Sequence, residues 1–257
     1  MSGRLILIPN TLDFGVDGAA VDLHEVLPLE VIRMAAGLTH WVAENAKTTR
    51  AFLKRVDAIV PLAQPVQTLN IVEMPRPPKG RTPVVDQTAR NNAWPALLAP
   101  ARAGHDIGLI SEAGLPAIAD PGALLVAAAH AEGIKVLPLS GPSSLLLALS
   151  ASGLNGQSFA FVGYLPVDAA ARAGRMRELE ALSRRLGQTQ LMIETPYRNQ
   201  ALLDALLAGL QPQTRLSVSC GLTLPSGWTR TSTVAQWRAK PQAMPDKVPS
   251  VFALLVD

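Results

Sequence analysis

Small and polar residues that could contact a ligand stand in short loops, each directly after a stretch that is typical of a strand. Loops of this kind begin at Pro9, Ala43, Ser111, Ser140 and Glu194. In parallel α/β sheets the loops at the carboxyl ends of the strands form the ligand crevice, because helix N-termini and free backbone N–H groups meet there. Several such loops at one sheet edge indicate a ligand of nucleoside size.

Taken one at a time, these loops have an equally good structural explanation. Gly114 can simply turn the chain, Pro142 can begin a helix, and Ser143 or Ser144 can cap one. The functional interpretation therefore depends on several loops meeting at one edge.

The sequence lacks the patterns that are typical of several other kinds of site. No G-x-G-x-x-G follows a predicted strand and no G-x-x-x-x-G-K-[ST] occurs, so dinucleotide and P-loop sites lose their main support. His24-Glu25 is not followed by a second histidine four residues later, as zinc hydrolysis would need. The four histidines are scattered, and we expect no metal site.

The elements that must hold these loops are clearest between residues 107 and 139. Ile107 to Ile110 is predicted to be a strand, Ala123 to Glu132 a helix, and Ile134 to Leu139 another strand. This order predicts a parallel βαβ unit with a right-handed crossover, and hence the α/β fold class. Asp120 is placed to cap the helix.

The same patterns predict further elements on both sides of this unit. Strands are expected at 5–9, 39–43, 159–164, 190–194, 215–219 and 251–256, and helices at 29–36, 47–56, 169–186 and 197–209. Six prolines between residues 61 and 83 predict a long loop there. We expect a boundary near Gly141, which gives domains of residues 1–140 and 141–257.

The composition fits two modest domains without a membrane segment. The 257 residues are 48% hydrophobic and 17% charged, which suits a chain with a sizeable core. No run of 18 apolar residues occurs, and Leu5 to Ile8 is shorter than the core of a signal peptide. The lone Cys220 cannot form an internal disulfide. We expect a cytoplasmic protein that does not contact a membrane.

Residues 47–56 predict a helix with basic side chains. Lys47, Arg50 and Lys54 could bind the phosphates of a nucleic acid, and the net charge of +3 permits such a partner without requiring it. The alternative, a helix face that is only solvated, is the more common outcome for such a pattern.

Several motifs, in a fixed order, resemble those of one enzyme family. Residues 110–122, I-S-E-A-G-L-P-A-I-A-D-P-G, are similar to S-D-A-G-T-P-x-I-S-D-P-G, and residues 138–144, P-L-S-G-P-S-S, are similar to P-L-P-G-P-S-A. Residues 150–154, 161–166 and 194–198 resemble S-A-S-G-L, F-x-G-F-L-P and E-S-P-H-R. By these motifs the chain is identified as a member of the tetrapyrrole methylase superfamily, and it resembles the branch of ribosomal small-subunit methyltransferase I.

The resemblance implies a fold, a cofactor and a partner. The fold has an N-terminal domain with a parallel sheet, a C-terminal domain with a mixed sheet, and a cleft for S-adenosylmethionine between them. The partner is 16S ribosomal RNA, methylated at a ribose 2′-hydroxyl by a homodimer. The residues that the motifs assign to the cofactor are Ser111, Glu112, Ala113, Gly114, Pro142, Ser143 and Ser144, together with Pro9, Glu194, Thr195 and Pro196.

The N-terminal half departs from the family pattern. T-P-I-G-N-L appears as I-P-N-T-L at residues 8–12, without its glycine, and A-E-D-T-R-R-T appears as A-E-N-A-K-T-T at residues 43–49. The resemblance therefore supports methyl transfer more strongly than it supports RNA as the acceptor. Two alternatives stay open, a methyltransferase for a small metabolite such as a tetrapyrrole and a binding protein that kept the cofactor cleft without turnover.

A base is needed only where the methyl acceptor must lose a proton. Transfer from a sulfonium depends mainly on aligning the acceptor with the methyl group, so no nucleophilic residue is required. A ribose hydroxyl does lose a proton, and Glu44, Glu112 and Glu194 are the carboxylates near the inferred cleft. We assign Glu112 as the base; the alternative is that its carboxylate only accepts hydrogen bonds from loop amides.

Overall fold

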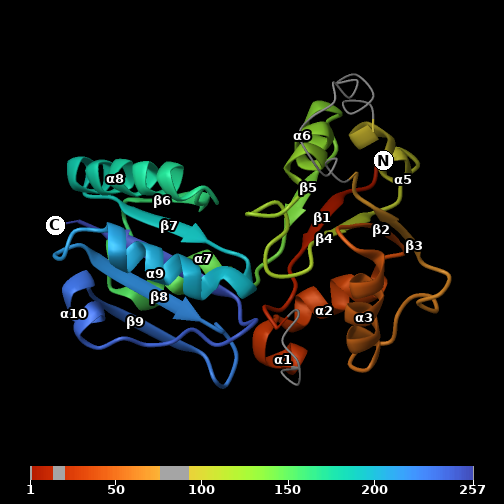
Figure 1. Ribbon diagram of the computed structural model, residues 1–257. Helices are drawn as coiled ribbons and strands as arrows, with labels where there is room; N and C mark the ends of the chain where they lie inside the picture. Colours follow the sequence, from red (N-terminus) through yellow and green to blue (C-terminus); the bar gives the residue numbers. More distant parts are fainter. Residues whose placement is uncertain (1, 14–20, 76–92, 257) are drawn as a thin grey trace. The chain divides into compact units, whose positions relative to one another are not determined.

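The structure is a computed structural model that describes residues 2–13, 21–75 and 93–256. Within these residues the chain divides into two compact units, the first reaching Pro142 and the second beginning at Ser143 (Figure 1). Each unit contains a five-stranded sheet covered by helices. No helix in these three ranges is long and apolar enough to cross a bilayer.

The first unit is built on a parallel sheet. Its strands are β1 (Leu5–Ile8), β2 (His40–Ala43), β3 (Asn70–Glu73), β4 (Ile107–Ile110) and β5 (Val136–Pro138). Their order in the sheet is β3-β2-β4-β1-β5, and every pair is parallel. The strand that begins the chain thus lies between the two strands of the predicted βαβ unit.

Helices bury both faces of this sheet, which explains why the central strands are apolar throughout. The helices whose bounds lie within the described residues are α1 (Leu23–Val26), α2 (Leu29–Gly37), α3 (Ala46–Asp57), α5 (Ala99–Arg102) and α6 (Ala123–Ala131). On one face Ile6 and Ile110 pack with α2 and α3. On the other face Leu5 and Leu109 pack with α5 and α6.

The second unit is built on a mixed sheet of order β6-β7-β10-β8-β9. Its strands are β6 (Phe159–Tyr164), β7 (Thr189–Ile193), β8 (Arg215–Cys220), β9 (Trp228–Thr233) and β10 (Ser250–Leu255). Strands β6 and β7 are parallel, whereas the other three pairs are antiparallel. The predicted α/β class, with one parallel and one mixed sheet, is confirmed.

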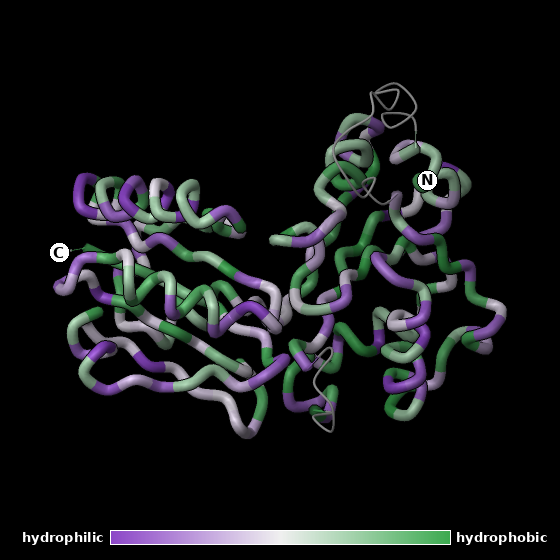
Figure 2. The backbone as a smooth tube through the Cα atoms, in the orientation of Figure 1, coloured by the Kyte–Doolittle hydropathy of each residue, from purple (hydrophilic) through white to green (hydrophobic). Residues whose placement is uncertain are grey.

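The helices of the second unit cover its sheet unequally. They are α7 (Ser144–Ser152), α8 (Ala169–Leu186), α9 (Asn199–Gly209) and α10 (Val234–Ala239), with the 3₁₀ turn η1 (Pro196–Arg198) before α9. Met192 and Phe252 pack with α8, α9 and α10 on one face, and Leu191 packs with α7 on the other. Figure 2 shows purple and green segments alternating along α8, because charged residues stand between the apolar ones in this helix.

Two local predictions were wrong. Asp120 does not cap a helix, because α6 begins at Ala123 with Gly122 as its N-cap residue and no side chain caps it. The proline-rich segment 61–83 is not only a loop, because β3 lies within its described part and pairs with β2. Residues 76–83 lie outside the described residues.

Candidate functional site

Asn10 ties the loop after β4 to the loop after β1. Its Nδ2 donates to the carbonyl oxygens of Ser111 and Glu112, both at 3.1 Å, and its backbone N donates to the carbonyl of Gly114 at 2.9 Å. Asn10 itself is buried, and its Oδ1 accepts from the N–H of Thr11. Four of the predicted cofactor residues, Ser111 to Gly114, are therefore held in one rigid loop by a residue that we did not predict as functional.

The loop after β2 is tied to the same place by Glu44. Because Ala43 and Ile110 are register partners at the ends of β2 and β4, the next residues of the two strands begin neighbouring loops. The Oε2 atom of Glu44 accepts a hydrogen bond of 3.0 Å from the N–H of Glu112. On the α3 side, the hydroxyl of Thr48 donates to Oε1 of Glu112 at 3.4 Å. Glu112, our predicted base, thus lies at the centre of a polar cluster.

Asp120 is the strongly perturbed acid of this loop. Partial burial, followed by the negative charges of Glu44 and Glu112, raises the pKa of the Asp120 carboxyl to about 7. A carboxyl with this pKa is about half ionised at neutral pH. The sequence pattern pointed to a helix cap here, because nothing local in it reveals the two neighbouring carboxylates.

Close backbone contacts bring the loops after β1, β4 and β5 together. A Cβ atom added at Gly114, where φ is +65°, would lie 3.3 Å from Leu12 Cδ2 and 3.4 Å from the carbonyl oxygen of Pro142. A Cβ atom at Gly141 would lie only 2.2 Å from Cβ of Pro9. Pro9, Gly114 and Pro142 are therefore neighbours at one edge of the first sheet, as the parallel-sheet argument predicted.

The remaining predicted cofactor residues belong to the second unit. Ser143 precedes α7 and Ser144 begins it, and the side chain of Ser143 makes no capping hydrogen bond. Glu194 follows β7, and its carboxylate accepts from the N–H of Thr195 at 2.7 Å and from Arg198 at 2.6 Å. These bonds tie Glu194 to the start and the end of the η1 turn, so the Glu194 carboxylate already has structural partners.

Helix α3 presents the predicted substrate residues to solvent. It begins at the N-cap Asn45, whose Oδ1 accepts from two backbone N–H groups, and it ends one residue beyond the predicted range. Lys47, Arg50 and Lys54 are exposed. Arg55 differs from them, because it is half-buried and pairs with Asp13 at 3.1 Å.

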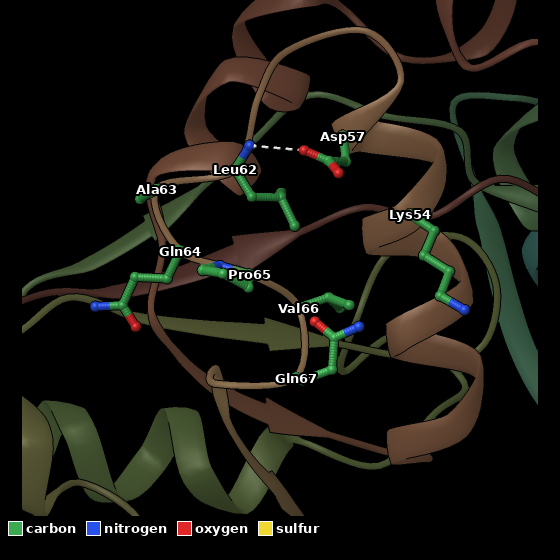
Figure 3. A pocket seen from close by; sticks show the side chains of 8 residues that line it. All are labelled: Lys54, Asp57, Leu62, Ala63, Gln64, Pro65, Val66 and Gln67. Atoms are coloured by element: carbon green, nitrogen blue, oxygen red, sulfur yellow. Dashed lines mark hydrogen bonds between the residues drawn. The ribbon is translucent and has the colours of Figure 1, made fainter.

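A hollow of about 500 Å³ lies between the end of α3 and the loop that follows it. Figure 3 shows Lys54 and Asp57 on the helix, with Gln64 to Gln67 on the loop across the hollow. Asp57 holds this loop by accepting a hydrogen bond of 3.0 Å from the N–H of Leu62. Lys54 is thus one of the residues that line this open hollow.

A family of known sequences matches most of this chain. The sequence model of the tetrapyrrole (corrin/porphyrin) methylases matches residues 45–236. This range includes every predicted site residue except Pro9.

Curated relatives match shorter segments and carry the name ribosomal RNA small subunit methyltransferase I. The protein from Mesorhizobium japonicum is 36% identical over 154 residues, which cover 60% of this chain and 51% of the relative. The protein from Xylella fastidiosa is 51% identical over 76 residues, which cover 30% of this chain and 28% of the relative. The matches thus span about half the length of these relatives or less.

Solved structures with the same fold match almost the whole chain. A uroporphyrin-III C-methyltransferase from Thermus thermophilus, complexed with S-adenosyl homocysteine, covers 98% of this chain and 97% of its own, with a TM-score of 0.52 and 18% identity. A putative cobalamin synthesis related protein, CobF, from Corynebacterium diphtheriae covers 99% and 98%, with a TM-score of 0.53 and 15% identity. At such identities the likeness concerns the fold alone.

Proposed function

Because this chain belongs to the tetrapyrrole methylase family, we propose that it transfers a methyl group from S-adenosylmethionine to a ribose 2′-hydroxyl of ribosomal RNA. The observation that carries this proposal is the loop Ser111 to Gly114, which Asn10 and Glu44 hold at the carboxyl edge of a parallel sheet. The name of the curated relatives supports RNA as the acceptor.

The loop residues fit S-adenosylmethionine in two respects. The hydroxyl of Ser111 is buried, and it has no hydrogen-bond partner in the described part of the chain. Gly114 leaves open the space that a side chain would fill between Leu12 and Pro142. We assign cofactor contacts to Ser111–Gly114, Pro9 and Pro142–Ser144, and more weakly to Glu194–Pro196. Residues 1–140 would then form the acceptor side and part of the cofactor cleft, and residues 141–257 the rest.

The chemistry asks little of the protein beyond alignment and proton removal. S-adenosylmethionine, when bound, supplies a methyl group on a cationic sulfur, and the acceptor oxygen forms its bond to carbon as the carbon–sulfur bond breaks. The residues of this chain must hold the acceptor in line and remove its proton. Both tasks fit a rigid loop with carboxylates around it.

The test of the proposed function uses ribosomal subunits and labelled cofactor. The purified protein should bind S-adenosylmethionine in calorimetry without added metal, and it should transfer a labelled methyl group into the RNA of small subunits that lack the modification. Labelling of a tetrapyrrole but not of RNA would support the small-metabolite alternative. Cofactor binding without transfer to any acceptor in a cell extract would support a binding protein.

Helix α3 gives an independent prediction for RNA binding. Arg50 and Lys54 are four residues apart on one exposed helix face. Changing both to alanine should reduce the slope of log affinity against log salt by about 1.4 to 1.8, since each neutralised phosphate contributes roughly 0.7 to 0.9. Cofactor affinity should not change.

The control for this prediction is the pair Arg184→Ala with Arg185→Ala. These arginines are exposed in the last turn of α8, in the second unit. The control removes the same charge but should leave the salt slope near that of the wild type. An equal fall in both double variants would mean that net charge alone sets the RNA affinity, and α3 would lose its assigned role.

We also propose a cytoplasmic homodimer. Its support is a set of exposed apolar side chains in the second unit, with Leu146 and Leu147 on α7 and with Phe159 and Phe161 on the edge strand β6. Exposed apolar side chains that gather in one patch often mark protein interfaces. Sedimentation analysis should find a dimer for the wild type and a monomer for Phe161→Lys; a monomeric wild type would remove this part of the proposal.

A further inference from the structure

We propose, resting on the function proposed above, that Asp120 is the base that accepts the hydroxyl proton of the methyl acceptor, in a cluster with Glu44 and Glu112 at the carboxyl edge of the first sheet. This assignment replaces Glu112, the base expected from the sequence.

The loop backbone carries Asp120 into this cluster by an unusual path. Ala117 and Ala119, just before Asp120, have φ angles of +67° and +63°, and Gly122 after it has a φ of +130°. Alanine rarely adopts a left-handed conformation, which costs about 1–2 kcal/mol per residue. A Cβ atom at Gly122 would lie 3.1 Å from Cδ2 of Leu109, so this part of the loop folds back onto β4. Packing therefore maintains a strained path that keeps Asp120 next to the β4 edge.

The three carboxylates have different partners. Glu44 accepts the N–H of Glu112, and Glu112 accepts the hydroxyl of Thr48. The carboxyl of Asp120 makes no hydrogen bond with any residue in the described ranges. It is also only half-buried. Glu44 and Glu112 thus hold the loop, and Asp120 is the acid left to receive a proton from a bound molecule.

The electrostatic surroundings suit that role. Burial and the charges of Glu44 and Glu112 raise the Asp120 pKa to about 7. A general base is most effective when its pKa lies near the working pH, because it is then both ionised and basic enough. An ordinary carboxylate is ionised at pH 7 but is a much weaker base.

A second observation, independent of the carboxylates, indicates that a ligand binds here. Ser111, which precedes Glu112, is 3% exposed, and its Oγ has no partner within residues 2–13, 21–75 and 93–256. Leaving a buried hydroxyl unsatisfied costs about 1–3 kcal/mol. A polar ligand atom at this loop would supply the missing hydrogen bond and would place the ligand beside the acidic cluster.

The proton balance of the proposed step is simple. The acceptor hydroxyl gives its proton to the ionised carboxylate of Asp120 as the oxygen forms its new bond to the methyl carbon. The oxygen uses an electron pair for that new bond, the pair of the O–H bond stays on the oxygen, and the pair of the broken carbon–sulfur bond leaves with the sulfur, which becomes a neutral thioether. Asp120, now neutral, releases the proton to water before the next turnover.

The first test uses the protein without cofactor or RNA. Since the native state keeps Asp120 protonated to about pH 7 and the ordinary value is 3.8, the native state binds more protons than the unfolded state between these values. Stability should then fall as pH rises through this window. Asparagine does not ionise, so Asp120→Asn lacks this fall in stability. The Tm of the variant minus the Tm of the wild type should therefore increase from pH 4 to pH 8. The control Glu30→Gln, an exposed carboxylate on α2, should show no such trend.

The second test measures the pH profile of methyl transfer. For the wild type, log kcat should rise with slope 1 and level off near pH 7. Asp120→Asn should lower kcat by about 10² to 10⁴ and abolish the rise of kcat with pH, with KM and cofactor affinity unchanged. Asp120→Glu should restore this rise. Glu44→Gln, which removes one repelling charge, should shift the rise to lower pH.

The outcomes separate this inference from the proposed function. A wild type that binds the cofactor but methylates no RNA contradicts the proposed function, and the stability test still measures the state of Asp120. A wild type that methylates RNA while Asp120→Asn keeps the full rate and pH profile shows that Asp120 is not the base. An unchanged pH dependence of Tm in Asp120→Asn would equally overturn the assignment.

Discussion

Replacing Gly114 by valine should weaken S-adenosylmethionine binding by about 100-fold or more, equivalent to about 2.7 kcal/mol. The expected cause is steric. Gly114 has a φ of +65°, and a Cβ atom there would already lie within 3.4 Å of Leu12 and Pro142. The two further methyl groups of valine would occupy the space that the cofactor needs beside the loop.

Gly133→Val is the matched control for this result. Gly133 follows α6 with a φ of +67°, but a Cβ atom there meets nothing within 4 Å. Both variants carry the same backbone strain, and only Gly114→Val crowds the loop. Calorimetry and thermal unfolding on the same preparations separate the effects. If both variants lose similar stability and both bind the cofactor normally, Gly114 only turns the chain.

Gly141→Ala should destabilise the first unit by about 3 kcal/mol, at the upper end of the cost of overpacking. The added Cβ would lie 2.2 Å from Cβ and 2.5 Å from Cγ of Pro9. Because a proline ring cannot rotate away, the loops after β1 and β5 would have to separate. A fall in Tm of roughly 6 to 12 °C should follow for a chain of this size.

Two further variants make this prediction specific. Gly37→Ala, at the end of α2 with nothing within 4 Å, should leave the Tm unchanged or raise it slightly. Pro9→Gly removes the ring, so Pro9→Gly with Gly141→Ala should recover much of the stability lost in Gly141→Ala alone. Additive effects of the two changes would contradict the contact between Pro9 and Gly141 as the cause.

The central strands could be predicted from sequence because their signal is local. Each residue of β4 is buried, so four apolar residues in a row mark a strand that is covered on both faces. Helix α3 was equally clear, since its buried residues recur at helical spacing and Asn45 caps its first turn. The loops between such elements could therefore be placed at one edge of the sheet.

Strand β3 could not be predicted from its own residues, because it is the pairing with β2 that makes this segment a strand. Of its residues Asn70, Val72 and Glu73 are exposed, and prolines flank the segment. Only the register from His40 with Asn70 to Ala43 with Glu73 makes it a strand. Arg55 shows the same limit, because sequence alone does not distinguish it from its basic neighbours and only its pair with Asp13 does.

Locating the acidic cluster required both the sequence motif and the strand pairing that the structure shows. The motif located the loop of Ser111 to Gly122, but Glu44 joins it from another part of the chain through the pairing of β2 with β4. Burial, followed by the proximity of the Glu44 and Glu112 charges, raises the pKa of Asp120, and neither can be read from the spacing of these residues. The motif therefore points to Glu112 as the base, whereas our proposal assigns that role to Asp120.

The position of β1 inside its sheet has a consequence for synthesis on the ribosome. Leu5 pairs with Ile107 on one side and Val136 on the other. Strand β1 therefore has no partner until β4 is made about 100 residues later, and its second partner, β5, follows about 130 residues after β1. At 5 to 20 residues per second the delay before β4 is made is roughly 5 to 20 s. During that time the run Leu5 to Ile8 is an unpaired apolar segment, the kind of surface that makes incompletely folded chains prone to aggregation.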